Sequence, residues 1–143
     1  MIKIAPLRAA LSCLPLIALA CPAAAEPHRY PVIATSGNVA AATAAATLPA
    51  AQGLITFISG FEITAGGATA GSCVTATVTG LAGGSLSYAY CAPTGATAAA
   101  APLVVPFRPP LPASSVNTAI AVTLPSLGAG NTTTSVSAHG FQQ

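Results

Sequence analysis

The sequence predicts an all-β protein, a single antiparallel β-sandwich of jelly-roll type that follows an N-terminal signal peptide. Apolar and polar residues alternate over several short blocks, Gly and Pro residues separate these blocks, and two cysteines bracket a stretch with the pattern of a β-hairpin. Several short strands joined by such turns are typical of a sandwich or jelly roll. We expect residues 1–25 to be the signal, residues 26–37 to be a flexible N-terminal segment and residues 38–143 to form the sandwich.

The start of the chain has the pattern of an export signal. Lys3 and Arg8 supply the positive charge, an apolar run follows, and three alanines precede Glu26. We therefore expect cleavage between Ala25 and Glu26, which would release a secreted or periplasmic protein with no further contact with the membrane. Lipidation of Cys21 is an alternative. A retained anchor is disfavoured, because the apolar run is short and interrupted by prolines.

Cleavage changes the charge of the protein. The whole chain has four Lys and Arg residues against two Asp and Glu residues, a formal net charge of +2. Arg29, Arg108, Glu26 and Glu62 remain after cleavage, so the mature chain has a formal net charge of zero. This balance predicts no attraction to nucleic acid or to an anionic membrane. So little surface charge favours a homo-oligomer, in which neighbouring copies cover uncharged surface.

The first two segments of the expected sandwich alternate to different degrees. In "NVAAATAAATLPA" the alanines favour a helix, but the threonines and the flanking Gly37 and Pro49 favour a strand, which is the interpretation we prefer. The next segment, "LITFISGFEIT", predicts a strand with Glu62 on its polar face. The apolar face of this strand is expected to contain Ile55, Phe57, Phe61 and Ile63.

The stretch from Cys73 to Cys91 predicts a β-hairpin with a defined register. If the two cysteines face each other, Val74 lies opposite Tyr90, and continuing this pairing gives one apolar or aromatic face and one face of mainly small, polar residues. A shift of one residue would mix the two faces. Residues 81–83 fit a three-residue loop that ends in a left-handed glycine.

The same register predicts a disulfide between Cys73 and Cys91. Directly opposite residues in an antiparallel pair hold their Cβ atoms about 4.5–5.5 Å apart, close to the range that a disulfide bridges. Export would place the chain in a compartment where this bond persists. Two free thiols are the alternative. A metal site is disfavoured, because the chain has no CxxC motif and His28 and His139 lie far from the hairpin in sequence.

The rest of the chain predicts further strands. In "PLVVPFR" the apolar face consists of Leu103, Val105 and Phe107. Pro106 within this run favours an edge strand, because proline cannot donate a hydrogen bond to a neighbour. In "VNTAIAVTL" the apolar face consists of Val116, Ile120, Val122 and Leu124. The last segment, "TTTSVSAHGF", is rich in β-forming residues but weakly patterned.

The mature chain has few groups for catalysis. A Ser–His–Glu set can be written with Ser59 or Ser137, His139 and Glu62, but no nucleophile-elbow motif accompanies it. A metal site of His and Glu side chains across a subunit interface is a further alternative. We predict a protein that is not an enzyme and that has no cofactor.

Three short patterns have both a binding interpretation and a plain one. "TATVT" forms a threonine ladder of the kind that ice-binding surfaces use, and threonine is also a good strand former. "FRPPLP" has the form of a proline-rich recognition segment, for which a loop between strands is the simpler interpretation. "NTT" at Asn131 matches a permissive glycosylation pattern.

Two long phrases, "ITFISGFEITAGGATAG" and "PPLPASSVNTAIAVTLPSLGAGNTTTSVSAHGFQ", belong to a pattern that spans residues 34–142, nearly the whole mature chain. This pattern resembles small uncharacterised proteins encoded in bacteriophage and prophage genomes. It implies a virion-associated β-sandwich, of decoration or fibre type, that acts as an oligomer, most simply a trimer. It implies no functional residues. The export signal and the cysteine pair depart from this pattern and favour a place outside the inner membrane.

These features predict an exported, non-enzymatic structural or surface-interaction protein. The alternative is a phage virion structural protein, and a hydrolase with the Ser/His/Glu set ranks third. Neighbouring genes for capsid or tail proteins would favour the virion, whereas neighbouring genes for secretion or envelope proteins would favour the exported protein.

We expect the exported protein to begin at Glu26 and to contain one disulfide. The intact mass of material purified from the exported fraction, measured before and after reduction and alkylation, reports both features. Two thiols that react with the alkylating agent before reduction would contradict the disulfide. A mass increase from a lipid on Cys21 would contradict cleavage at Ala25.

Overall fold

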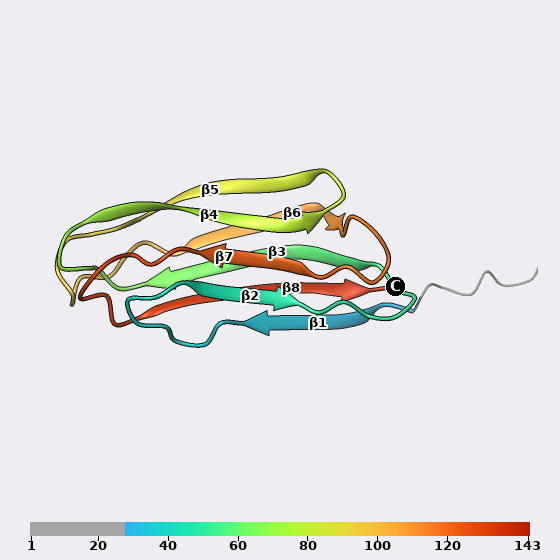
Figure 1. Cartoon of the computed structure of the whole chain (residues 1–143), viewed down its shortest axis with the longest axis horizontal. Coiled ribbons are helices and arrows are strands. Elements are labelled where there is room, and N and C mark those ends of the chain that lie inside the picture. The colour runs from blue at the N-terminus through green and yellow to red at the C-terminus, as the bar shows by residue number, and fades with distance from the viewer. Residues whose placement is uncertain (1–27) are drawn as a thin grey trace, which may run out of the picture.

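The computed structural model describes residues 28–143. These residues form eight β-strands, arranged in two antiparallel sheets. Sheet A has the strand order β1-β8-β3-β6 and sheet B has the order β2-β7-β4-β5. The strands are β1 (Tyr30–Thr35), β2 (Ala44–Leu48), β3 (Thr56–Ala65), β4 (Ser72–Leu81), β5 (Gly84–Ala92), β6 (Leu103–Pro112), β7 (Ile120–Leu124) and β8 (Thr134–Gln142). They run along the long axis of the molecule (Figure 1). The predicted β-sandwich is therefore confirmed, and no membrane-spanning helix occurs among the described residues.

The core lies between the two sheets, because each sheet turns one apolar face toward the other. Sheet A contributes side chains such as Phe61 and Ile63, and sheet B contributes Leu48, Val78 and Ile120, all of which are fully buried. The segment rich in alanine forms β2, as preferred from the sequence, with Ala44, Ala46 and Leu48 buried and the residues between them exposed. β2 also contacts β1 and β8, which closes the sandwich along this side.

The β4–β5 hairpin has the predicted register but a different turn. Cys73 pairs with Cys91, and the pairing continues without a break to Val78 and Leu86. Beyond this point Thr79 and Gly80 together face one residue of β5, which forms a bulge, and the turn contains residues 82 and 83. The predicted three-residue loop with a left-handed Gly83 is wrong, because the bulge places the positive φ at Gly80 and Gly84 instead.

A second bulge changes the face assignment of β3. The register shifts at Ser59, so Ile58, Phe61 and Ile63 point into the core. Phe57 was expected on the apolar inner face. It lies on the outer face of sheet A instead, where its ring stacks on that of Phe141 at 5.0 Å between centroids. The extra residue of a bulge moves the side chains on one side of it to the opposite face.

The later strands agree with the sequence in most respects. β6 is an edge strand, as Pro106 predicted, and its expected apolar face, Leu103, Val105 and Phe107, packs against the core from a half-buried position. β7 buries Ile120, Val122 and Leu124. Val116 was expected on the same face, but it precedes β7 in a turn and is 44% exposed. The segment "FRPPLP" was expected to be a loop, but all of it belongs to β6.

The sandwich begins before residue 38, the boundary expected from the sequence. Tyr30–Thr35 form β1 and pair with β8 over the whole length of β1, so part of the segment 26–37 that we expected to be flexible is an edge strand. Pro31 is compatible with this place, because an edge strand has one free row of backbone groups. The predicted signal peptide and the cleavage site between Ala25 and Glu26 lie outside the described residues.

Gly80 is the glycine of the hairpin whose replacement we expect to be most damaging. Its φ is +86°, and an added Cβ would collide with the carbonyl oxygen of Ala119. Gly80→Ala should lower the free energy of unfolding by about 2 kcal/mol or more. Urea unfolding followed by circular dichroism measures this change.

Gly83 provides the matched control in the same hairpin. An added Cβ at Gly83 would meet no atom within 4 Å, and the residue does not have a positive φ. Gly83→Ala should change the free energy of unfolding by less than about 0.5 kcal/mol. Equal losses in the two variants would show that the bulge does not depend on glycine.

Candidate interaction surfaces

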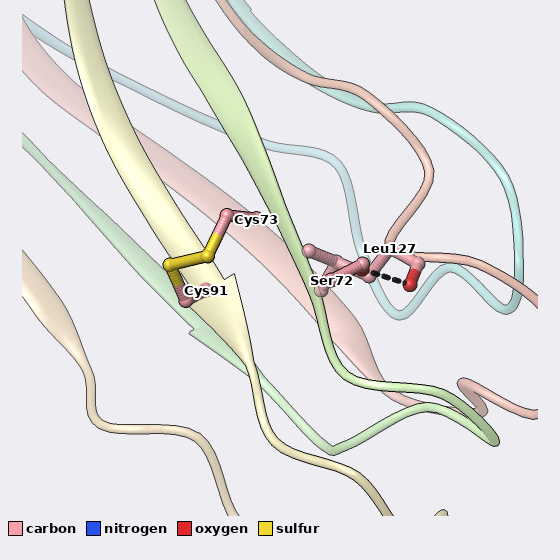
Figure 2. The surroundings of a disulfide bond; sticks show 4 residues. All are labelled: Ser72, Cys73, Cys91 and Leu127. Carbon is pink, nitrogen blue, oxygen red and sulfur yellow. Dashed lines mark hydrogen bonds between the residues drawn. A yellow bond between two sulfur atoms is a disulfide. The ribbon is translucent and has the colours of Figure 1, made fainter.

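Cys73 and Cys91 form a disulfide across the open end of the β4–β5 hairpin (Figure 2). Their Cα atoms are 4.0 Å apart, and both residues are exposed on the outer face of sheet B. The neighbouring Ser72 turns the other way and donates a hydrogen bond to the carbonyl oxygen of Leu127, in the loop after β7. The bond therefore joins the two strands at the end opposite their turn. It consumes both thiols, so this pair offers no free nucleophile and no metal ligand.

The outer face of sheet B is made of small, uncharged side chains. Thr75, Thr77 and Thr79 alternate along β4, as "TATVT" predicted, and all of them point outward. Thr77 lies beside Ser87 of β5 on one side and Thr123 of β7 on the other. We call this surface the threonine face. None of the four strands of sheet B contains a charged residue or a histidine.

Every charged or imidazole side chain of residues 28–143 lies on sheet A or next to it. His28 and Arg29 directly precede β1, whereas Glu62, Arg108 and His139 lie on β3, β6 and β8. The two sheets thus have outer faces of different chemistry. Within the described chain, charged side chains therefore lie on the sheet A side of the molecule and not on the sheet B side.

Aromatic rings and an arginine gather at one end of the outer face of sheet A. The rings of Phe57 and Phe141 stack, and the guanidinium carbon of Arg29 lies 4.8 Å from the centroid of the Phe141 ring. An arginine in this position is attracted to the ring by a cation–π interaction. The sequence did not reveal this group, because it depends on the bulge in β3 and on the pairing of β8 with both β1 and β3.

A shallow depression of about 450 Å³ lies further along the same face. Residues 104–110 of β6 line one side of it, and Ser59, Gly60 and His139 line the other. Gly60 has no room for a side chain, since an added Cβ would lie 2.8 Å from the carbonyl oxygen of Val105. The walls are largely backbone, proline and aliphatic carbon, with Arg108 and His139 as the ionisable groups.

The residues of the conceivable Ser–His–Glu set are neighbours on sheet A. Glu62 pairs with Ser137, and Gly60 pairs with His139. The hydroxyl of Ser59, however, donates to the backbone carbonyl of His139 at 3.0 Å, and the hydroxyl of Ser137 lies 3.5 Å from that of Thr35. Over the described residues no hydrogen bond joins the His139 ring to either serine or to Glu62.

Asn131, the residue of the glycosylation pattern, has a structural role. It is 2% exposed, its amide donates to the carbonyl oxygen of Gly66 at 2.9 Å, and its carbonyl oxygen accepts from the hydroxyl of Thr134 at 2.7 Å. A glycan on Nδ2 would not fit at this buried position unless the side chain left it, and both contacts would then be lost. Among residues 28–143 there is no group of three or more His, Cys, Asp or Glu residues that could hold a metal ion.

Comparison with known proteins gives no relative from which a function could be transferred. No protein-family model, curated protein or solved structure matches the chain.

Replacing both cysteines by serine should leave the sandwich folded but less stable. The loop that the disulfide closes has a sequence separation of 18, for which the chain-entropy model gives about 3 kcal/mol. We expect a smaller loss, because the apolar face of the hairpin still holds the two strands together. The far-ultraviolet circular dichroism spectrum should not change, and the midpoint of urea unfolding should fall.

Reduction of the wild-type protein is the control for this variant. It should lower the midpoint by the same amount as Cys73→Ser combined with Cys91→Ser. A double variant that is unfolded, or one that is as stable as the oxidised protein, would contradict the interpretation of the disulfide as a cross-strand staple.

Proposed function

We propose that this protein is an exported, non-enzymatic structural or surface-interaction β-sandwich that acts as a homo-oligomer. The observation that carries the proposal is the distribution of charge. The outer face of sheet B, the threonine face, has no charged side chain, and the sheet ends in a strand, β5, that contains no charged residue and no proline. An unprotected edge strand can pair with another chain, and a surface with so little charge favours association.

The disulfide supports the exported location. Disulfides form and persist in oxidising compartments such as the periplasm and the extracellular space. Cys73 and Cys91 are bonded to each other and exposed, so a reducing cytosol would have access to the bond. The periplasm or the exterior of the cell is therefore the proposed location.

A phage virion structural protein is the second candidate. Both candidates require that copies of the sandwich assemble, and both use surfaces in place of an active site. They differ in where assembly occurs: a capsid assembles in the cytoplasm, where a structural disulfide is rare. The exposed disulfide is the observation that favours the exported protein.

The mature protein is expected to be a closed homo-oligomer at micromolar concentration. Light scattering coupled to size-exclusion chromatography measures its mass, and the mass should be a multiple of the monomer mass across a tenfold dilution. Closed symmetry predicts one defined species and no filaments. A stable, soluble monomer over the whole concentration range would contradict the proposed function.

A further inference from the structure

The four edge strands of the sandwich differ in how well they are protected. An exposed edge presents a row of free N–H and C=O groups that can pair with another chain, and proteins block it with proline, charge, short length or cover. β6 contains Pro106, Pro109, Pro110 and Pro112 and so lacks several donors. β1 and β2 are short and lie against each other at the closed side of the sandwich.

β5 has none of these protections. It is nine residues long, contains no proline and no charged residue, and pairs with β4 alone among the described strands. Figure 1 shows it at the outer margin of the molecule. The least protected edge thus belongs to the sheet that has no charge on its outer face.

The geometry of the disulfide identifies the free backbone groups of β5. Opposite residues with Cα atoms about 4.5 Å apart form a non-hydrogen-bonded pair, whereas hydrogen-bonded pairs are about 5.5 Å apart. The Cα atoms of Cys73 and Cys91 are 4.0 Å apart, so Cys91 belongs to the first class. The classes alternate along the ladder, so Ala89 and Ser87 belong to it too. All three residues direct N–H and C=O away from β4.

Apolar side chains next to this edge are incompletely covered. Leu86 and Tyr88 point to the inner side of β5 and are half-buried, whereas Tyr90 is 4% exposed. Leu86 lines a gap of about 170 Å³, and Leu111 and Pro112 of β6 line its other side. A strand added to β5 would remove further apolar surface from water here, in addition to pairing the free backbone groups.

We propose that a second copy of this chain pairs with β5 through its own β5, antiparallel and about a two-fold axis at Ala89. Ala89 is the middle one of the three residues with free backbone groups, so this register lets each of them donate and accept once. Ser87 of one copy would face Cys91 of the other. Neither strand contains a charge, so nothing repels the pairing. Sheet B would continue from one copy into the next.

This inference rests on the proposed homo-oligomer and specifies its contact. A two-fold axis uses the same edge on both copies, so pairing removes both free edges and the assembly closes at two subunits. A dimer is therefore expected in place of the trimer that the phage resemblance implies. A contact through the threonine face, by contrast, would leave β5 free.

Ala89→Lys tests the contact, and Ala45→Lys is its matched control. Both alanines are exposed on the outer face of sheet B, one on each of its edge strands. Two lysines would face each other across the axis in the first variant, and like charges directly opposite destabilise a strand pair. Like charges juxtaposed at an interface cost several kcal/mol, so light scattering should show that Ala89→Lys raises the dimer dissociation constant by about 100-fold or more. Ala45→Lys should leave it unchanged.

Hydrogen exchange gives a readout that does not depend on a substitution. In a monomer the amides of Ser87, Ala89 and Cys91 face solvent, whereas in the proposed dimer they are hydrogen-bonded. Their exchange measured by nuclear magnetic resonance should be about tenfold or more slower in the wild-type protein than in Ala89→Lys. The amides of Tyr88 and Tyr90, which point toward β4, should be protected in both proteins.

The outcomes separate this inference from the proposed function. A wild-type dimer that Ala89→Lys dissociates and Ala45→Lys does not, with protected amides at Ser87 and Ala89, supports the β5 contact. Three results would overturn the β5 contact and leave homo-oligomer formation standing. The wild-type oligomer could be unaffected by either variant, it could be dissociated by both variants, or it could be a trimer. A wild-type monomer overturns both.

Discussion

The packing of two apolar sheet faces against each other is the interaction on which the rest of this structure depends. Arg29, Glu62 and Arg108 are the charged residues of the described chain, so ion pairs can contribute little. Surface ion pairs are in any case worth about 0–1 kcal/mol each. Burial of side chains such as Phe61, Leu48 and Ile120 therefore has to supply most of the stabilisation. Each of the two β-bulges changes which side chains of its strand point into the core, so both bulges affect this packing directly.

A few buried polar contacts hold the ends of the two sheets together. The side-chain amide of Gln142 on β8 donates to the carbonyl oxygen of Pro49 at 2.7 Å, and the hydroxyl of Thr56 on β3 donates to the same oxygen at 3.0 Å. Pro49 directly follows β2, so these bonds join sheet A to sheet B. Tyr90 is the exception: its buried hydroxyl has no hydrogen-bond partner among the described residues, and burial raises the pKa of this phenol.

The sequence predicted those parts of the fold that depend on local alternation. The β4–β5 register followed from its two faces, and the proline in β6 identified an edge strand. The bulge at Ser59 was missed, although a glycine inside a strand, here Gly60, is a signal for one. β1 was missed because its pairing with β8 is a contact between the two ends of the described chain. The edge of β5 could not be identified as free until the order of all the strands was known.

The disulfide links the stability of β5 to what its edge can do. An edge strand has one neighbour, so it frays more easily than a central strand and its free groups are less well fixed. β5 is held at one end by the tight turn to β4 and at the other by the bond from Cys91 to Cys73. This leaves the backbone between the two ends little freedom to slide or to separate. A partner strand would therefore meet a template that is already ordered, and association would cost less conformational entropy than pairing with a loose edge. In the proposed dimer the disulfide would therefore serve assembly as well as folding.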